Sequence, residues 1–279
     1  MRPQTWSLLP LLATLPIPDS VSASECKTFT PRREWRTMTE PERAKWISAL
    51  KCLMSITYER LSFAADGSAF SRTHTLYDQF SYAHHEAREV IHDNAYFLPW
   101  HRWFLKIFYD RLGDTCDYHG PQPYWDWSLD FQDLSSSPVF DPDPIHGLGR
   151  EGDCINSACY IQNGAFASTI FAHPIAHPLT RNLSLTLNNG PQDLSHNVSM
   201  NPTNILNITR QNTPGDFFRF QYQLTHVHND LHNFVGGDFA GVCPEGTPWT
   251  GSGECENSYT PNDPLFWLHH GNLDRLWSN

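Results

Sequence analysis

Apolar side chains recur at helical spacing in five segments of the chain. In the first segment, residues 41–61, Trp46, Leu50, Leu53 and Met54 fall on one face, because residues three and four apart share a side of a helix. Strand-like alternation is scarce, and no segment repeats. The pattern therefore predicts a mainly α protein. The other predicted helices span residues 77–91, 97–112, 217–234 and 264–277.

Proline and glycine mark the ends of two predicted helices. Pro99 lies in the first turn of the 97–112 helix, where a missing backbone N–H costs nothing. Gly113 follows that helix, and Gly236 with Gly237 follows the 217–234 helix. Because glycine commonly ends helices, we expect both helices to stop there.

Two long segments lack helical periodicity. Residues 120–142 are rich in Pro, Asp and Trp, and residues 180–215 are rich in Asn, Ser, Thr, Gly and Pro. These residue types favour turns and loops. We therefore predict irregular structure in both segments and an exposed excursion at 180–215.

Size and charge limit the classes of function. The 279 residues, 39% of them hydrophobic, suit a globular protein of one large domain or two small ones. The formal net charge is −11, and no basic stripe is present. We expect no nucleic-acid partner, because binding phosphates needs clustered Lys and Arg. After the N-terminus no apolar run approaches the ~20 residues of a membrane span.

The first 23 residues have the pattern of a signal peptide. Arg2 is the positive start, residues 8–17 are mostly apolar, and residues 21–23 are small. The alternative is a leader that is never cleaved. We therefore expect a protein of the secretory pathway or the exterior, with residues 24–279 as its domain. Three sequons predict N-glycosylation at Asn182, Asn197 and Asn207.

All seven cysteines follow this leader, so disulfides are expected. Cys154 with Cys159, and Cys243 with Cys255, are close enough in sequence to close small loops. One more pair, with one thiol left over, comes from Cys26, Cys52 and Cys116.

Six of the fifteen histidines form two groups that lie far apart in the chain. His228 and His232 are four residues apart, so on a helix both can reach one ion. Imidazole suits copper, zinc, iron and nickel, and three imidazoles leave an ion open to a further ligand. A pair of such ions can bind a small bridging molecule such as dioxygen. The groups are His84, His92 and His101, and His228, His232 and His270.

Neighbouring histidines leave part of this assignment open. His85 competes with His84 for the same place. His85, His226 and His269 are also close enough in sequence to orient a ligand imidazole. A scattered histidine such as His74 is interpreted as an ordinary polar residue.

Three motifs resemble the tyrosinase family of type-3 copper proteins, which includes tyrosinases, catechol oxidases and molluscan haemocyanin units. The first joins His92 to Phe-Leu-Pro-Trp-His-Arg at 97–102. The second is Asp-Pro-Leu-Phe-Trp-Leu-His-His at 263–270, followed by Asp274, and the third is Pro-Tyr-Trp-Asp-Trp at 123–127. The resemblance covers the chain from about Trp35 onward. It implies an antiparallel four-helix bundle enclosing a dinuclear metal site, with long irregular loops.

The resemblance also implies roles for individual residues. Short fungal members place the first ligand eight residues before the second, which selects His84 over His85. Arg102 and Asp274 match positions that pair behind the site, and Asp126 resembles a supporting carboxylate. The implied ligands of two copper ions are His84, His92 and His101 for copper A, and His228, His232 and His270 for copper B.

This chain departs from the family pattern at several points. Tyr109 stands where the first signature has a glutamate. Gln221, a neutral amide, is the nearest match to a glutamate that orients a water for phenol deprotonation, and Asn229 matches its partner. No cysteine lies between 52 and 116, so the usual cysteine–histidine thioether cannot form. The sequence stops at Asn279 inside the last predicted helix, where relatives continue, so we expect a C-terminal truncation.

The implied activity is oxidation of a small phenolic substrate by O2 to an ortho-quinone, in fungal pigment or secondary-metabolite synthesis. We expect ortho-diphenols to react faster than monophenols, because Gln221 is a poorer proton acceptor than a carboxylate. One alternative is a zinc-dependent, non-oxidative enzyme on the same histidines, since three imidazoles also suit zinc. The other is a haemocyanin-like protein that binds O2.

Overall fold

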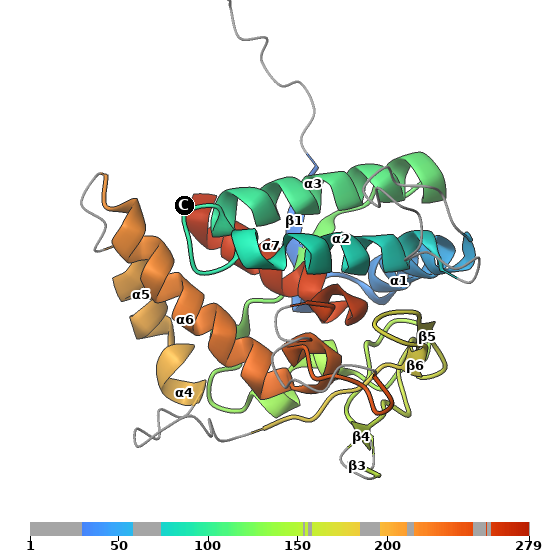
Figure 1. The fold of residues 1–279 in the computed structure, drawn as a ribbon. Coiled ribbons are helices and arrows are strands. Elements are labelled where there is room, and N and C mark those ends of the chain that lie inside the picture. The colour runs from blue at the N-terminus through green and yellow to red at the C-terminus, as the bar shows by residue number, and fades with distance from the viewer. Residues whose placement is uncertain are drawn as a thin grey trace, which may run out of the picture.

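The computed structural model confirms the mainly α class (Figure 1). It describes residues 30–57, 74–152, 154–155, 158–184, 196–210, 215–247, 255 and 258–278. The regular four-helix bundle stays a prediction. The α-helices of the described part are α1 (Glu40–Ser55), α2 (Leu76–Ile91), α3 (Phe97–Cys116), α4 (His196–Ser199), α5 (Pro202–Arg210), α6 (Phe217–Val235) and α7 (Leu265–Ser278).

Side-chain caps fix the starts of α1 and α2. Thr39 accepts a hydrogen bond from the backbone of Glu42, whose side chain accepts one back from Thr39. Thr75 and Asp78 form the same reciprocal cap on α2. Such a capping box satisfies two N–H groups that a helix end leaves unpaired. The helix predicted over 41–61 is shorter, because α1 ends at Ser55.

The predicted stop of α3 at Gly113 is wrong. The helix continues to Cys116, and Asp117 ends it in the left-handed conformation, with φ of 53°. The Asp117 N–H donates to the carbonyl oxygens of Gly113 and Leu112. A disulfide joins Cys116 to Cys52 of α1 and holds this last turn against its neighbour.

The predicted irregular excursion at 180–215 is wrong for residues 196–210, which form α4 and α5. Ile205 and Ile208 are three residues apart and both are buried. α5 packs on α6, and burial of this short apolar stripe stabilises a helix whose polar composition predicts a loop.

The strands of the described residues are short pairs. The segment 120–142 is irregular as predicted, apart from β2 and three single turns of 3-10 helix. The pairs are β1 (Arg32–Glu34) parallel to β2 (Gln122–Tyr124), β3 (Cys154–Ile155) with β4 (Ala158–Cys159), and β5 (Ile170–Phe171) with β6 (His177–Pro178).

Aromatic side chains join α2, α3 and α7 in the core. Phe108 of α3 stacks on Trp267 of α7, with ring centroids 3.5 Å apart. Trp267 donates its indole N–H to the Tyr77 hydroxyl over 2.9 Å, and Tyr77 donates to the Pro261 carbonyl. Figure 1 shows α2 and α3 side by side, running in opposite directions.

A buried ion pair positions the start of α7. Arg181 and Asp263 are both fully buried, and two guanidinium nitrogens donate to the carboxylate over 2.7 and 2.8 Å. Arg181 also donates to the carbonyls of Leu148 and Gly149. Asp263 accepts from the Leu265 N–H, so the same carboxylate caps the helix.

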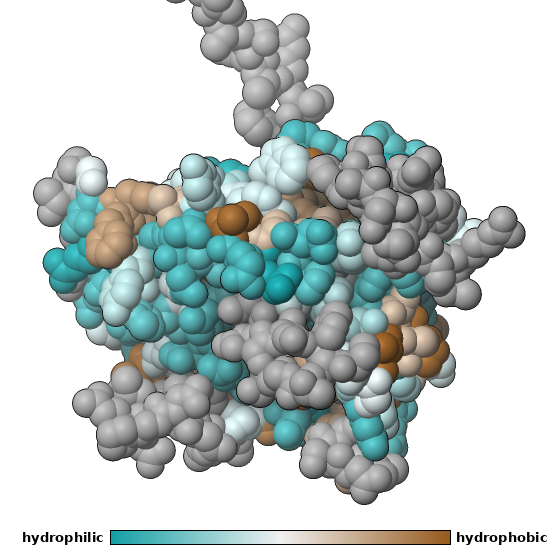
Figure 2. Space-filling view, in the orientation of Figure 1, coloured by the Kyte–Doolittle hydropathy of each residue, from teal (hydrophilic) through white to brown (hydrophobic). Residues whose placement is uncertain are grey.

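The predicted disulfides Cys154–Cys159 and Cys243–Cys255 are confirmed, and the third pair is Cys52–Cys116. Cys26 and the predicted leader lie outside the described residues. Within the described ranges, none of the helices has the length and apolar character needed to cross a membrane. The face in Figure 2 is largely hydrophilic, with an apolar patch over the N-terminal end of α6.

Candidate metal centre

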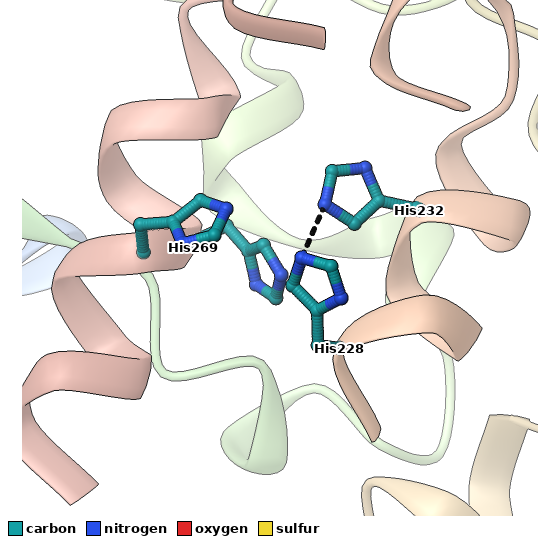
Figure 3. A group of neighbouring side chains, drawn as sticks. His228, His232 and His269 are labelled. Carbon is teal, nitrogen blue, oxygen red and sulfur yellow. Dashed lines mark hydrogen bonds between the residues drawn. The ribbon is translucent and has the colours of Figure 1, made fainter. Parts of the chain in front are cut away.

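Four helices bring the predicted histidines together. His84 lies on α2 and His92 directly follows that helix. His101 lies in the second turn of α3, and His228 and His232 lie one turn apart on α6. His269 and His270 come from α7. Figure 3 shows the rings of His228, His232 and His269 turned toward one another from α6 and α7.

The ring nitrogens gather into two groups, each with its nitrogens within 4.8 Å of one another. The groups adjoin, because the rings of His101 and His270 stack at 4.2 Å with planes 8° apart. His85 and His226 belong to neither group. The first group is His84, His92 and His101, and the second is His228, His232, His269 and His270.

Backbone carbonyls fix the orientation of the first group. The Nδ1 atoms of His84, His92 and His101 lie 2.7, 3.0 and 2.7 Å from the carbonyl oxygens of Ser258, Arg88 and Phe97. A carbonyl oxygen only accepts, so each Nδ1 carries the hydrogen. Each Nε2 is then left with a lone pair, which is the arrangement found in metal-bound histidines.

The same arrangement holds for two histidines of the second group. His228 Nδ1 donates to Asn229 Oδ1 over 2.8 Å, and His232 Nδ1 donates to the Phe239 carbonyl. Their Nε2 atoms face each other at 3.0 Å. Two lone pairs at this distance repel unless a cation or a proton lies between them, so the pair is suited to hold a metal ion.

Hydrogen bonding separates His270 from His269. The Trp127 indole N–H donates to His269 Nδ1 over 3.3 Å, so the hydrogen of the neutral His269 ring is on Nε2. That nitrogen has no lone pair to offer a metal. Among the described residues neither ring nitrogen of the buried His270 has a hydrogen-bond partner, whereas in the equally buried His269 only Nε2 lacks one. An unpartnered buried imidazole is costly, and a bound ion would satisfy it.

Burial keeps these imidazoles neutral. Desolvation, followed by the neighbouring histidines, holds the pKa of His84, His101, His228 and His270 well below the ordinary value of 6.5. Desolvation lowers the pKa of His232 to about 4. Because only a neutral imidazole can bind a metal, the site favours binding at neutral pH.

Aromatic rings surround the two groups and exclude water. Phe266 lies 4.2 Å from the ring of His270 and 5.2 Å from that of His84, and Phe97 lies 4.8 Å from His228, all between centroids. Both phenylalanines are buried. An apolar surround of this kind strengthens the electrostatic interactions inside it.

Carboxylates behind the site hold α7 in place. Asp274 pairs with Arg102 of α3, as the resemblance implies, and with Arg32. Asp126 accepts from Arg275 over 2.8 Å and from the Ser128 hydroxyl, and no contact with a ligand candidate is seen among the described residues. Asp126 therefore acts on the helix that carries His270 and not on an imidazole.

Sequence reasoning missed the groups that orient the imidazoles. The carbonyls of Ser258, Arg88 and Phe239 leave no sequence signal, because every residue has one. Trp127, which sets the tautomer of His269, lies inside the Pro-Tyr-Trp-Asp-Trp motif. That motif was the one feature of the sequence that could have indicated a group acting on an imidazole.

A helical fold with two adjoining sets of histidines defines a class of protein built to hold a pair of metal ions. Comparison with known proteins then places the chain. Residues 69–279 match the family described as the common central domain of tyrosinase. The chain therefore belongs to the tyrosinase family.

Relatives in sequence include fungal proteins. Tyrosinase-like protein phomQ1' of Diaporthe leptostromiformis is 31% identical over 271 residues, covering 91% of this chain and 64% of that protein. Tyrosinase ustQ of Aspergillus flavus is 31% identical over 264 residues, covering 90% of this chain and 64% of that protein. This chain thus spans less than two thirds of the length of these relatives. A polyphenol oxidase variant from Thermothelomyces thermophila has a TM-score of 0.66 and 25% identity, covering 89% of this chain and 69% of that one.

Proposed function

We propose that the chain is a dicopper oxidase that converts ortho-diphenols to ortho-quinones with dioxygen. The observation that carries this proposal is the convergence of six neutral imidazoles in two sets of three. Five have Nδ1 engaged and Nε2 free, and the sixth, His270, has both nitrogens without a partner among the described residues.

The residues fit copper by their chemistry. All the donors are imidazole nitrogens, and for such sites copper(II) has the highest affinity of the first-row divalent ions. We assign His84, His92 and His101 to one ion and His228, His232 and His270 to the other. Two bound copper ions would supply the electron exchange by which two diphenols become two quinones while one O2 becomes two waters.

The protein would orient the ligand imidazoles, exclude water from the site and direct the movement of protons. Asn229 holds His228 through its Oδ1, so it acts on the reaction by orienting an imidazole. Gln221 donates its amide N–H to the Asn94 carbonyl, and its buried Oε1 accepts no hydrogen bond within the described structure. That oxygen can orient a water, but a neutral amide does not take a phenolic proton. Diphenols are therefore the favoured substrates.

We further propose that the protein enters the secretory pathway and serves pigment or secondary-metabolite synthesis. Three disulfides favour an oxidising compartment. The side chains of Asn182 and Asn207 are exposed, as glycosylation requires. The fungal origin of both relatives favours a small phenolic substrate of fungal metabolism.

The experiment is oxygen uptake with catechol by copper-loaded protein, with zinc-loaded protein as the control. We expect one O2 consumed for every two quinones formed with copper, and no uptake with zinc. A copper-loaded protein that binds O2 without turnover would contradict the proposal and favour a carrier.

A further inference from the structure

A cavity of about 230 Å³ lies beside the histidine groups, between the connection from α2 to α3 and the helix α6. One wall is formed by Asp93, Asn94 and Ala95. The other is a face of α6 that includes Gln221 and Tyr222. The bond from the Gln221 amide to the Asn94 carbonyl ties the two walls together.

On both walls, residues of this cavity lie close in the chain to ligand candidates, although none of the described lining residues is itself one. Asn94 is two residues after His92, and Asn229, which also lines the cavity, follows His228 and accepts its Nδ1–H. The rings of His92 and His228 face each other with centroids 6.3 Å apart. The cavity therefore adjoins the line where the first group meets the second.

An exposed aromatic ladder borders the cavity along α6. Phe218, Tyr222 and His226 are spaced four residues apart and all three line the cavity. Phe218 is 79% exposed and Tyr222 57%. Their rings stack with centroids 6.1 Å apart, and His226 meets Tyr222 edge-on at 4.6 Å. The apolar patch in Figure 2 lies over this end of α6.

An exposed aromatic pair on a helix can be simply a local contact between side chains four residues apart. Two observations point here to a ligand. The rings line a formed cavity whose opposite wall is another segment of the chain. Exposed apolar surface beside a cavity is typical of binding grooves.

We propose that the cavity and the aromatic ladder form an accessory subsite that binds an aromatic or branched apolar group attached to the phenol. The inference rests on the proposed function and extends it to the class of substrate. An engineered cavity of about 150 Å³ already admits a benzene ring, so this volume suits one ring. Asp93 is the one carboxylate of the described lining, which holds no lysine or arginine, so the site fits a neutral arm better than an anionic one.

Under this assignment Tyr222 and Phe218 determine specificity and take no part in the oxidation. Their rings offer stacking surface to a planar arm. Loss of a single methylene from an apolar pocket changes discrimination by about 10-fold or more. Removal of the Tyr222 ring should therefore lower the preference for substrates that carry an arm by at least about tenfold.

The test compares catechol with 4-benzylcatechol, using copper-loaded Tyr222→Ala. We expect the ratio of kcat/KM for 4-benzylcatechol to kcat/KM for catechol to fall about tenfold. Phe218→Ala should lower it in the same direction. A second measurement is the Kd of N-benzylacetamide, which has no phenol to oxidise, from saturation-transfer NMR on the loaded protein. The Kd should rise by a similar factor.

The matched control is Tyr96→Ala, which removes another exposed tyrosine that is absent from the cavity lining. Both the ratio and the Kd should stay at the wild-type values. In Tyr222→Ala, an equal loss of kcat/KM for the two catechols, or an unchanged Kd together with an unchanged ratio, overturns the subsite. The aromatic ladder would then be assigned to contact with a protein partner. If wild type oxidises neither catechol, the proposed function fails, while N-benzylacetamide binding still decides the subsite.

Discussion

At the scale of single residues, hydrogen bonds distinguish ligands from their neighbours. His269 and His270 are adjacent, buried and in the same group of ring nitrogens. The Trp127 N–H forces the hydrogen of His269 onto Nε2, whereas His270 keeps both nitrogens available. The resemblance selects His270 by its place in the motif, and the tautomer of His269 gives a physical reason for the same choice.

This reasoning predicts opposite results for two matched substitutions. His270→Asn should lose one of two bound metal ions and the oxidase activity, because a nitrogen ligand is removed. His269→Asn should keep both ions, since the amide oxygen can still accept from Trp127. Metal content measured on each purified variant decides between the two. His84→Ala and His85→Ala form a second pair, in which only the first should lose metal.

Another residue-scale prediction concerns Gln221. A carboxylate at this position could accept the phenolic proton, and general-base assistance is worth about 10²–10⁴-fold. We expect Gln221→Glu to raise monophenol turnover relative to diphenol turnover, toward the lower end of that range. Gln223→Glu, on the same helix but outside the cavity lining, is the control. Equal ratios of monophenol to diphenol turnover in the two variants would show that position 221 does not take part in removing the phenolic proton.

Sequence reasoning is strongest for residues whose chemistry is unusual. The four-residue spacing makes His228 and His232 candidate ligands from the sequence alone, whereas the choice of His84 over His85 needed the family resemblance. The atoms that orient them are ordinary carbonyls, such as that of Phe239, so residue identity carries no information about them. Their role follows only from how the chain folds.

At the scale of elements, a helix was predicted correctly where the local sequence pattern matched its tertiary packing. The helix predicted over 217–234 and the observed α6 differ by one residue. The apolar stripe of this segment and the glycines that follow it indicate the same end of the helix. α5 was missed because its composition is polar and only Ile205 and Ile208 bury it. Its stability comes from packing on α6, which a local window does not contain.

The placement of α7 depends on the buried pair of Arg181 and Asp263. Removing one partner leaves a buried charge without compensation, which costs about 3–5 kcal/mol. Arg181→Ala should therefore lower the free energy of unfolding by about that amount in urea titration. The control is Arg33→Ala, which breaks the partly exposed pair with Glu42 and should lower the free energy of unfolding far less. Similar losses in both variants would contradict the anchoring role.

At the scale of the whole molecule, the buried histidines make stability depend on pH. In the metal-free protein the pKa of His232 is about 4, and desolvation holds those of His84, His101 and His228 well below 6.5. Between pH 6.5 and 4 the unfolded chain binds more protons than the folded one, so stability falls as pH falls. His232 alone should cost about 3 kcal/mol by pH 4.

His177 does not offset this loss. Burial opposes its protonation, but the carboxylate of Asp238, 2.6 Å away, raises its pKa above the ordinary value. A histidine with a raised pKa contributes its full stabilisation at every pH below its ordinary pKa of 6.5. His177 therefore does not change how stability varies with pH between 6.5 and 4. Urea midpoints of metal-free protein at pH 4.5, 5.5 and 7 should rise with pH. A flat or falling series would show that the histidines are not buried as neutral groups.

The central claim is that this chain holds two copper ions on six histidines. Its most direct test is the metal content of the purified protein, by elemental analysis together with native mass spectrometry. We predict two copper ions per chain in wild type and one in His270→Asn. One ion per wild-type chain, or two zinc ions that copper does not displace, would contradict the account.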